Sequence, residues 1–129
     1  MRFAGDSSMI RPSCPALVIH DDDAFRKSLI AALDQHHFTV TFASDGDGAV
    51  DLLRSRTFHV VLLGVNIATK NGMQSLEPAR EARERMKSCV IILGDAHPQL
   101  RNCAPWADET LLKPVDAAYV ATRARSYCD

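Results

Sequence analysis

The sequence has no long apolar segment and no excess of charge of either sign. Its most apolar stretches, residues 60–63 and 90–93, are far shorter than the ~20 residues that a membrane-spanning helix needs. The N-terminal residues include no continuous apolar core, so we expect no signal peptide and a cytoplasmic protein. Lys and Arg together number 15, Asp and Glu 16, and the net charge is −1. This balance does not favour a membrane or a nucleic acid as the main partner.

Cysteines at metal-binding spacing are also absent. The chain has no C-x-x-C pair and no histidine at zinc-ligand spacing from its four scattered cysteines, Cys14, Cys89, Cys103 and Cys128. In a cytoplasmic protein we expect these four residues to be reduced thiols. We expect Cys89 to belong to the core, because it precedes an apolar run, and Cys128 to be exposed.

The chain does contain a regular alternation of short apolar runs and amphipathic segments. Its 129 residues suit a single domain that can be stable without disulfides or a structural metal. We predict a flexible tail over residues 1–14 and one domain over residues 15–129. The apolar and β-branched runs predict strands at residues 16–19, 38–42, 58–63, 90–93 and 110–112. Helices are expected over residues 22–36 and 44–54, from a loop at 64–71 to about 86, from about 98, and over 116–126.

Residues that typically start helices stand at the expected positions. The acidic residues 21–23 offer an N-cap and negative charge to the first helix, and Ser44 and Asp116 can cap two later helices. Pro78 must kink the third helix or mark its start, because it lacks the backbone donor that a helix interior requires. On that helix, basic residues mix with acidic ones, which indicates a solvated face with ion pairs between near neighbours.

The alternation of five strands and five helices, (βα)5, is typical of the flavodoxin-like α/β fold. This fold is a doubly wound, parallel five-stranded sheet with helices on both faces. In such sheets the reactive groups gather beyond the carboxyl ends of the strands. The residues expected at those ends are His20, Asp21, Asp22, Gly64, Gly94 and Lys113.

Four segments, in this order and spacing, resemble the receiver domain of bacterial response regulators over about residues 15–127. They are residues 17–26, residues 60–66 with Asn71-Gly72, residues 90–94 and residues 111–114. The resemblance implies two-component (phosphorelay) signalling, in which a phosphoryl group moves to an aspartate at the end of the third strand. It also implies a divalent cation held by that aspartate and two acids after the first strand. A lysine at the end of the fifth strand pairs with the phosphoryl group.

Four working positions of the family carry other residues in this chain. Gly64 stands where the phosphorylated aspartate is expected, and no acidic residue follows it closely. His20 stands at the first metal-binding acid, Gly94 at the switch hydroxyl and Thr110 at the switch aromatic. The positions that match the family's pattern are Asp21, Asn66 and Lys113. Because Asp21, with Asp22 at most, is the only carboxylate left, we expect no useful Mg²⁺ binding and no other cofactor.

These departures predict a pseudo-receiver, which is not an enzyme and acts by phosphorylation-independent protein–protein interaction. Lys113 is then expected to form a salt bridge with Asp21, with Asp95 as a second candidate partner. Protein partners, or a second copy in a homodimer, are expected on the face of the fourth helix, fifth strand and fifth helix. Trp106 and Tyr119 can anchor such contacts, although Trp106 as core filling is an equal alternative.

A second function stays open at this point. The chain can also be a receiver that accepts a phosphoryl group on a substitute carboxylate, Asp21 or Asp22, with residual metal binding. We favour it less, because phosphoryl transfer depends strongly on how the reacting groups are positioned.

Overall fold

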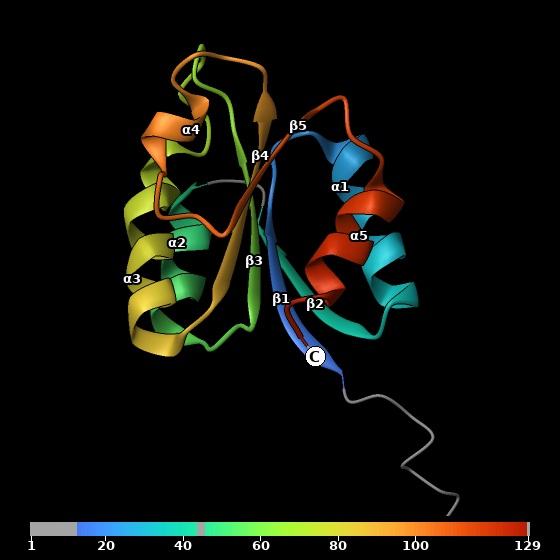
Figure 1. Cartoon of the computed structure of the whole chain (residues 1–129). Helices are drawn as coiled ribbons and strands as arrows, with labels where there is room; N and C mark the ends of the chain where they lie inside the picture. The colour runs from blue at the N-terminus through green and yellow to red at the C-terminus, as the bar shows by residue number, and fades with distance from the viewer. Residues whose placement is uncertain (1–12, 44–45, 129) are drawn as a thin grey trace, which may run out of the picture.

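A computed structural model describes residues 13–43 and 46–128 of the chain. Five parallel strands form one sheet in the order β2-β1-β3-β4-β5. Helices α1 and α5 cover one face of this sheet, and α2, α3 and α4 cover the other (Figure 1). The doubly wound fold predicted from the sequence is therefore confirmed. The strands are β1 (Cys14–Ile19), β2 (Phe38–Ala43), β3 (Val60–Val65), β4 (Cys89–Asp95) and β5 (Glu109–Lys113).

The helices follow the predicted order, with shifted ends. Helix α1 spans Asp23–Gln35, α2 spans Gly46–Ser55, α3 spans Leu76–Met86 after a short 3-10 helix η2 (Met73–Ser75), α4 spans Leu100–Cys103, and α5 spans Ala117–Arg125. The side chain of Asp22 caps α1, accepting a hydrogen bond from the N–H of Phe25 at 3.0 Å. Asp116 precedes α5, but its side chain makes no capping hydrogen bond. Pro78 lies in the first turn of α3, so it marks the start of that helix. The predicted cap Ser44 lies outside the described residues.

Alternate residues of the central strands supply two hydrophobic clusters, one on each face of the sheet. Val61 and Leu63 pack in the cluster under α2 and α3, whereas Val60 and Leu62 pack in the cluster under α1 and α5. All four side chains are completely buried. A strand buried on both faces is apolar at every position, which is why the sequence pattern located it correctly.

Strands β3 and β4 continue through glycines that the sequence placed beyond the strand ends. Gly64 was expected to begin a loop but lies within β3, where its Cα pairs with Leu93 of β4. Gly94 likewise lies within β4, paired with Leu112 of β5. The ladder hydrogen bonds use only backbone groups, so strands on both sides can hold a glycine that its own propensity would exclude. Strand β1 also begins earlier than predicted, at Cys14.

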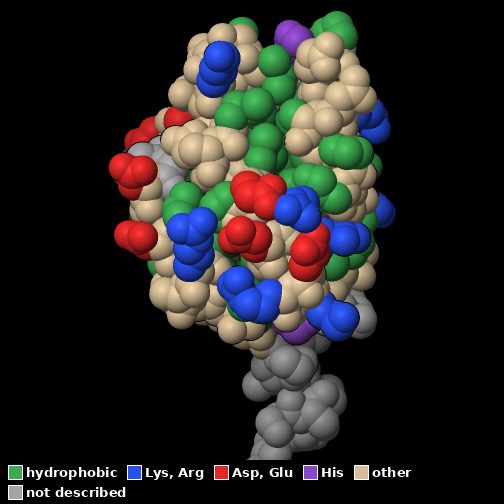
Figure 2. Space-filling model, turned by 90° about the vertical axis from the view of Figure 1, so that its left-hand side faces the viewer, with side chains coloured by type: hydrophobic (Ala, Val, Ile, Leu, Met, Phe, Trp, Pro, Cys, Tyr) green, Lys and Arg blue, Asp and Glu red, His purple; other side chains and the backbone are tan. Residues whose placement is uncertain are grey.

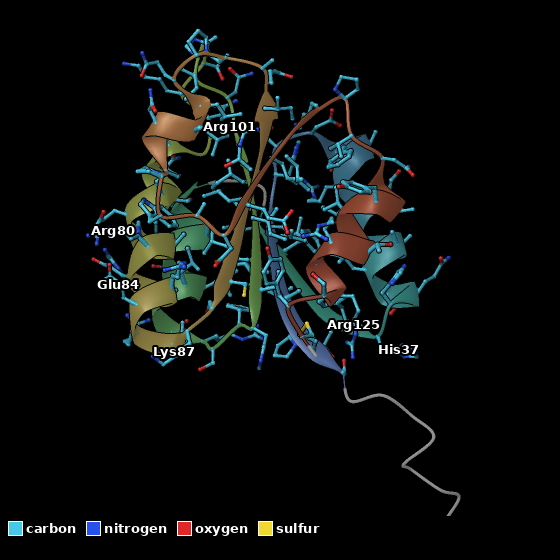
Figure 3. The ribbon with its side chains drawn as sticks, viewed as in Figure 1. His37, Arg80, Glu84, Lys87, Arg101 and Arg125 are labelled. Carbon is cyan, nitrogen blue, oxygen red and sulfur yellow. A yellow bond between two sulfur atoms is a disulfide. The ribbon has the colours of Figure 1, made fainter. Side chains whose placement is uncertain are left out.

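The thiol prediction was wrong for two of the four cysteines. Cys14 and Cys128 form a disulfide, with Cα atoms 6.3 Å apart, and the yellow bond in Figure 3 marks it at the start of β1. Cys89 and Cys103 are free. Cys128 is half-buried instead of exposed. The two bonded residues are 114 positions apart, and only the packing of α5 against α1 and β1 brings them together.

Helix α3 carries the predicted ion pairs. Arg80 donates to Glu77 at 3.0 Å and to Glu84 at 2.6 Å, and Figure 2 shows acidic and basic side chains side by side on this face. Arg83 reaches further and forms two hydrogen bonds of 3.1 Å with Asp108, just before β5. No helix in the described part of the chain is long and apolar enough to cross a membrane.

Candidate functional site

Three residues that the sequence placed at strand ends meet at the carboxyl edge of the sheet. His20 follows β1, Gly64 lies near the end of β3, and Lys113 is the last residue of β5. His20 is only 2% exposed, and its Nε2 lies 2.5 Å from Lys113 Nζ. The peptide bond between Lys113 and Pro114 is cis. The structure brings these three residues together at the edge of the sheet where the sequence placed them, and they lie on the side that α1 covers.

The imidazole of His20 occupies the space beside Gly64. A Cβ atom added at Gly64 would lie 2.6 Å from His20 Cδ2, and its three nearest neighbours would all be atoms of this ring. The ring also packs against Phe25, with the ring centroids 5.0 Å apart. A side chain at position 64 and this histidine therefore exclude one another.

Both nitrogens of the His20 ring lie close to a donor group, and in a neutral ring only one of them accepts a hydrogen bond. The backbone N–H of Asp22 donates to Nδ1 at 3.1 Å, and Lys113 approaches Nε2. Arg26 holds the same segment, donating to the carbonyl oxygen of His20 at 2.9 Å. Burial, followed by the positive charge of Lys113, lowers the pKa of His20 below its ordinary value. The ring is therefore neutral near pH 7.

Lys113 does not form the predicted salt bridge with Asp21. Its ammonium contacts His20 and lies 5.4 Å from the centroid of the Phe25 ring, and no described carboxylate comes within ion-pair distance of it. The Asp21 carboxylate turns instead to Asn71, whose side-chain amide donates to it at 2.6 Å. Asp95 pairs with Lys113 through the strand backbone, but its side chain is exposed. The prediction failed because a neighbouring amide and a buried ring satisfied both groups.

Asp22 has a structural task as well. Its carboxylate caps α1, and the hydrogen bond from the N–H of Phe25 is the largest cause that lowers the pKa of Asp22. Asp22 is also exposed to solvent. The two acids of the pocket rim are thus held by an amide and by a helix N-terminus.

The loop after β3 approaches the strand closely. Gly72 has a φ of 83°, and a Cβ atom there would lie 2.0 Å from the carbonyl oxygen of Gly64. Only glycine fits this position. Asn66 pairs with Asn71 through the backbone, and its side-chain oxygen accepts a hydrogen bond from the N–H of Thr69 at 3.1 Å.

Position 94 has no room for a hydroxyl-bearing side chain. A Cβ atom at Gly94 would lie 2.7 Å from the carbonyl oxygen of Val65 and 2.9 Å from Leu100 Cδ1. Leu100 belongs to α4 and is buried. Thr110 is half-buried on β5, where its Cα pairs with Ile92.

The expected docking face is partly apolar. Tyr119 is 52% exposed and Leu112 is 42% exposed. A hollow of about 470 Å³ lies nearby, lined by Ala96, His97, Pro98, Leu100, Arg101 and Leu112. Trp106 is half-buried and packs against the core under α2 and α3. This position supports core filling over an exposed anchor for Trp106.

Three residues that shape the pocket went unassigned in the sequence. Phe25 supports His20 and Lys113, Asn71 holds Asp21, and Leu100 fills the space beside Gly94. The sequence pattern identifies Phe25 and Leu100 only as apolar residues of helices, and Asn71 only as part of a loop. The one signal available in the sequence was the presence of glycine at 64 and 94, because a missing side chain leaves volume that a neighbour must fill.

The donor groups of the pocket are few. Among residues 13–43 and 46–128, no three His, Cys, Asp or Glu side chains come together in a way that could hold a metal ion. Besides the rim acids Asp21 and Asp22, the pocket contains a lysine ammonium and a histidine ring. Mg²⁺ needs a near-octahedral set of oxygen ligands, and this set does not match it.

Comparisons with known proteins agree with the resemblance seen in the sequence. A model of the response regulator receiver domain matches residues 16–125. The chain is 24% identical over 112 residues to the transcriptional regulatory protein DltR of Streptococcus agalactiae. This match covers 84% of the chain and 49% of DltR. The chain is 23% identical over 110 residues to the transcriptional regulatory protein SrrA of Staphylococcus aureus, covering 85% and 46%. The chain spans about half the length of these curated relatives.

Solved structures share the fold. The receiver domain of the Francisella response regulator 1452 superposes with a TM-score of 0.75 at 20% identity, covering 89% of this chain and 96% of that one. A response regulator protein from Burkholderia pseudomallei, solved with a phosphorylated aspartic acid, a calcium ion and citrate, has a TM-score of 0.73 at 19% identity. The match covers 88% of this chain and 72% of that protein.

Proposed function

Because this chain belongs to the response regulator receiver domain family, we propose that it is a receiver domain of two-component signalling that works without being phosphorylated. The observation that carries this proposal is the His20 ring beside Gly64, 2.6 Å from where a side chain would begin. Position 64 has no carboxylate to accept a phosphoryl group, and the volume for one is filled. The domain then has no catalytic activity of its own and acts through protein–protein binding.

The remaining acids do not offer a good substitute acceptor. Asp22 would have to give up the N-cap of α1, and Asp21 would have to leave Asn71. The lysine that serves the phosphoryl group in the family contacts His20 here. Phosphoryl transfer depends on how the reacting groups are positioned. These contacts therefore favour a domain that works without phosphorylation over one that is phosphorylated on Asp21 or Asp22.

We propose no role for Mg²⁺ in this pocket. The cation that the family resemblance implies requires a near-octahedral set of oxygen ligands. Here Asp21 and Asp22 are held by Asn71 and by the start of α1, and the side chains between them and β5 are an imidazole, an ammonium and the Phe25 ring. The residues present therefore do not fit the ion.

The proposed partner is another protein that docks on α4, β5 and α5. Leu112 and Tyr119 are exposed on this face and can anchor a contact, either with a signalling protein, an effector domain or a second copy of the chain. We propose no direct contact with nucleic acid or membrane, and a cytoplasmic location. DltR and SrrA are transcriptional regulators, and an output of that kind is a proposal for any longer protein that includes this domain.

Intact mass spectrometry tests the proposal. The protein is incubated with acetyl phosphate and Mg²⁺, and we expect no phosphoryl adduct. A stoichiometric adduct on the unchanged protein would overturn the proposal, and peptide mapping to Asp21 or Asp22 would establish the alternative.

A restored pocket provides the matched control. The double variant His20→Asp/Gly64→Asp removes the ring and supplies the two acids that the family carries at these positions. We therefore expect it to regain Mg²⁺ binding, measured by isothermal calorimetry. Gly64→Asp alone keeps the ring in place and should not regain it. If Gly64→Asp alone binds Mg²⁺ as well as the double variant, the steric argument at His20 is wrong.

A further inference from the structure

The two bonded cysteines join opposite ends of the described chain. Cys14 is the first residue of β1, and Cys128 follows the end of α5. Their Cα separation of 6.3 Å lies within the range that disulfides span without backbone movement. Cys14 is 4% exposed, whereas Cys128 is half-buried. Cys128 is therefore the bonded residue that reagents in solution reach more easily.

Side-chain contacts attach the end of α5 and the turn after it, residues 126–128, to β5 and to the start of β2. Glu109 of β5 accepts hydrogen bonds from Arg123 at 3.1 Å and from the hydroxyl of Tyr127 at 2.5 Å. Arg125 donates to the carbonyl oxygen of His37 at 3.4 Å, with its guanidinium 5.9 Å from the centroid of the Phe38 ring. Figure 3 shows Arg125 and His37 beside one another at this end of the molecule. The last turn is thus held on β5, β2 and β1, and only the β1 attachment is covalent.

We propose that Cys14 and Cys128 form a redox-controlled clasp on the end of α5. In the oxidised state the disulfide holds residues 126–128 against β1. In the reduced state the contacts of Arg123 with Glu109 and of Arg125 with His37 keep α5 in place, while residues 126–128 open locally. The clasp lies at the amino edge of the sheet, whereas His20 and Lys113 lie at the carboxyl edge. It therefore responds to redox conditions independently of the pocket.

Glutathione disulfide is a sufficient oxidant for the step. The thiolate of Cys128, the more exposed of the two, attacks glutathione disulfide and releases one glutathione thiolate. The thiolate of Cys14 then attacks Cys128 Sγ, forms the Cys14–Cys128 bond and displaces the second glutathione. The two cysteines lose two electrons and two protons, and these appear in two molecules of glutathione. Reduction by excess glutathione runs through the same mixed disulfide in reverse.

Alkylation in defined glutathione buffers tests the clasp. The whole chain is equilibrated at several ratios of reduced to oxidised glutathione, quenched with acid, denatured and treated with N-ethylmaleimide before intact mass. We expect alkylation of only the two free cysteines, Cys89 and Cys103, in the oxidising buffers and of all four cysteines in the reducing ones. A tryptic map should show the Cys14 and Cys128 peptides linked. Alkylation of all four at every ratio, or a link through Cys89, would overturn the proposal.

Matched variants separate this pair from the other thiols. Cys89→Ser/Cys103→Ser should keep the full transition, because neither residue belongs to the clasp. Cys128→Ser should abolish the intramolecular link. Loss of the link in the first variant would contradict the assignment, as would its survival in the second.

Hydrogen exchange tests whether reduction acts locally. We expect the amides of residues 126–128 to exchange about tenfold faster in the reduced protein through local opening. Those of β1 and β3 should change only by the loss of global stability that urea unfolding of the same two states measures. Equal exchange in the two states would show that the bond controls nothing. An acceleration of β1 and β3 beyond the measured loss of global stability would show that reduction loosens the sheet as well as the last turn, and would equally refute the proposal.

Discussion

The imidazole of His20 lies where a side chain at position 64 would project, and this relation ties the two residues together. The nearest contact is only 2.6 Å and involves the ring itself, whose other contacts are Phe25, Lys113 and the N–H of Asp22. The backbone at Gly64 does not adopt a positive φ, which among the described glycines is confined to Gly72. The requirement for glycine at position 64 is therefore steric and depends on one neighbour.

A double-mutant cycle measures this dependence. Gly64→Ala should lower the free energy of unfolding by about 1–3 kcal/mol, because the new methyl group overlaps the ring. In a His20→Ala background the same change should be neutral or slightly stabilising, because alanine loses less conformational entropy than glycine on folding. Urea unfolding of the four proteins gives both values. An equal cost in the two backgrounds would contradict the steric pairing.

The lowered pKa of His20 predicts a pH dependence of stability. The unfolded chain binds a proton at His20 near the ordinary value of 6.5, and the folded chain only at lower pH. The contribution of His20 to the free energy of unfolding should therefore be complete well above pH 6.5. It should decrease as the pH falls through 6.5, until the pH is also below the pKa of His20 in the folded state. The difference between the unchanged protein and His20→Gln, measured by urea unfolding from about pH 5 to about pH 8, should follow this course. Parallel profiles would contradict it.

Helix α4 shows how a short element is placed by one side chain. It has four residues, too few to be stable by its own hydrogen bonds. Leu100 of this helix packs into the space left by Gly94, and both residues are buried. The position of α4, and with it the hollow beside Leu112, therefore depends on glycine at position 94.

A second cycle distinguishes a side-chain obstacle from a backbone one. Gly94→Ala should lower the free energy of unfolding by about 1–3 kcal/mol. Leu100→Ala should relieve only part of this cost, since the carbonyl oxygen of Val65 stays 2.7 Å from the added Cβ. Urea unfolding of the single and double variants measures the relief. Complete relief would show that Val65 does not constrain this position.

At the scale of the whole molecule, the disulfide closes nearly the entire domain into one loop. Its two residues lie 114 positions apart, and closing such a loop restricts the unfolded chain far more than the folded one. The predicted sheet and hydrophobic clusters explain why the domain folds, and the bond adds stability through the unfolded state.

Removal of this bond should be visible in global unfolding. Cys14→Ser should lower the free energy of unfolding by about 3–5 kcal/mol relative to the oxidised protein, and a reductant should then have no further effect. Cys103→Ser is the control, since Cys103 is free and its variant should keep the response to reductant. Equal stability of Cys14→Ser and the oxidised protein would mean that the bond contributes little.

The sequence alone was sufficient for the order of strands and helices, the parallel sheet, a helix cap within residues 21–23 and the edge at which His20, Gly64 and Lys113 gather. These features follow from patterns within a few residues, or from the rule that parallel strands align their carboxyl ends. The tertiary structure decided the partner of Lys113, which is His20, 93 positions away, the bond between Cys14 and Cys128, and the continuation of β3 and β4 through Gly64 and Gly94. Each of these depends on which distant group fills a given volume or satisfies a given backbone, and neither periodicity nor composition carries that information.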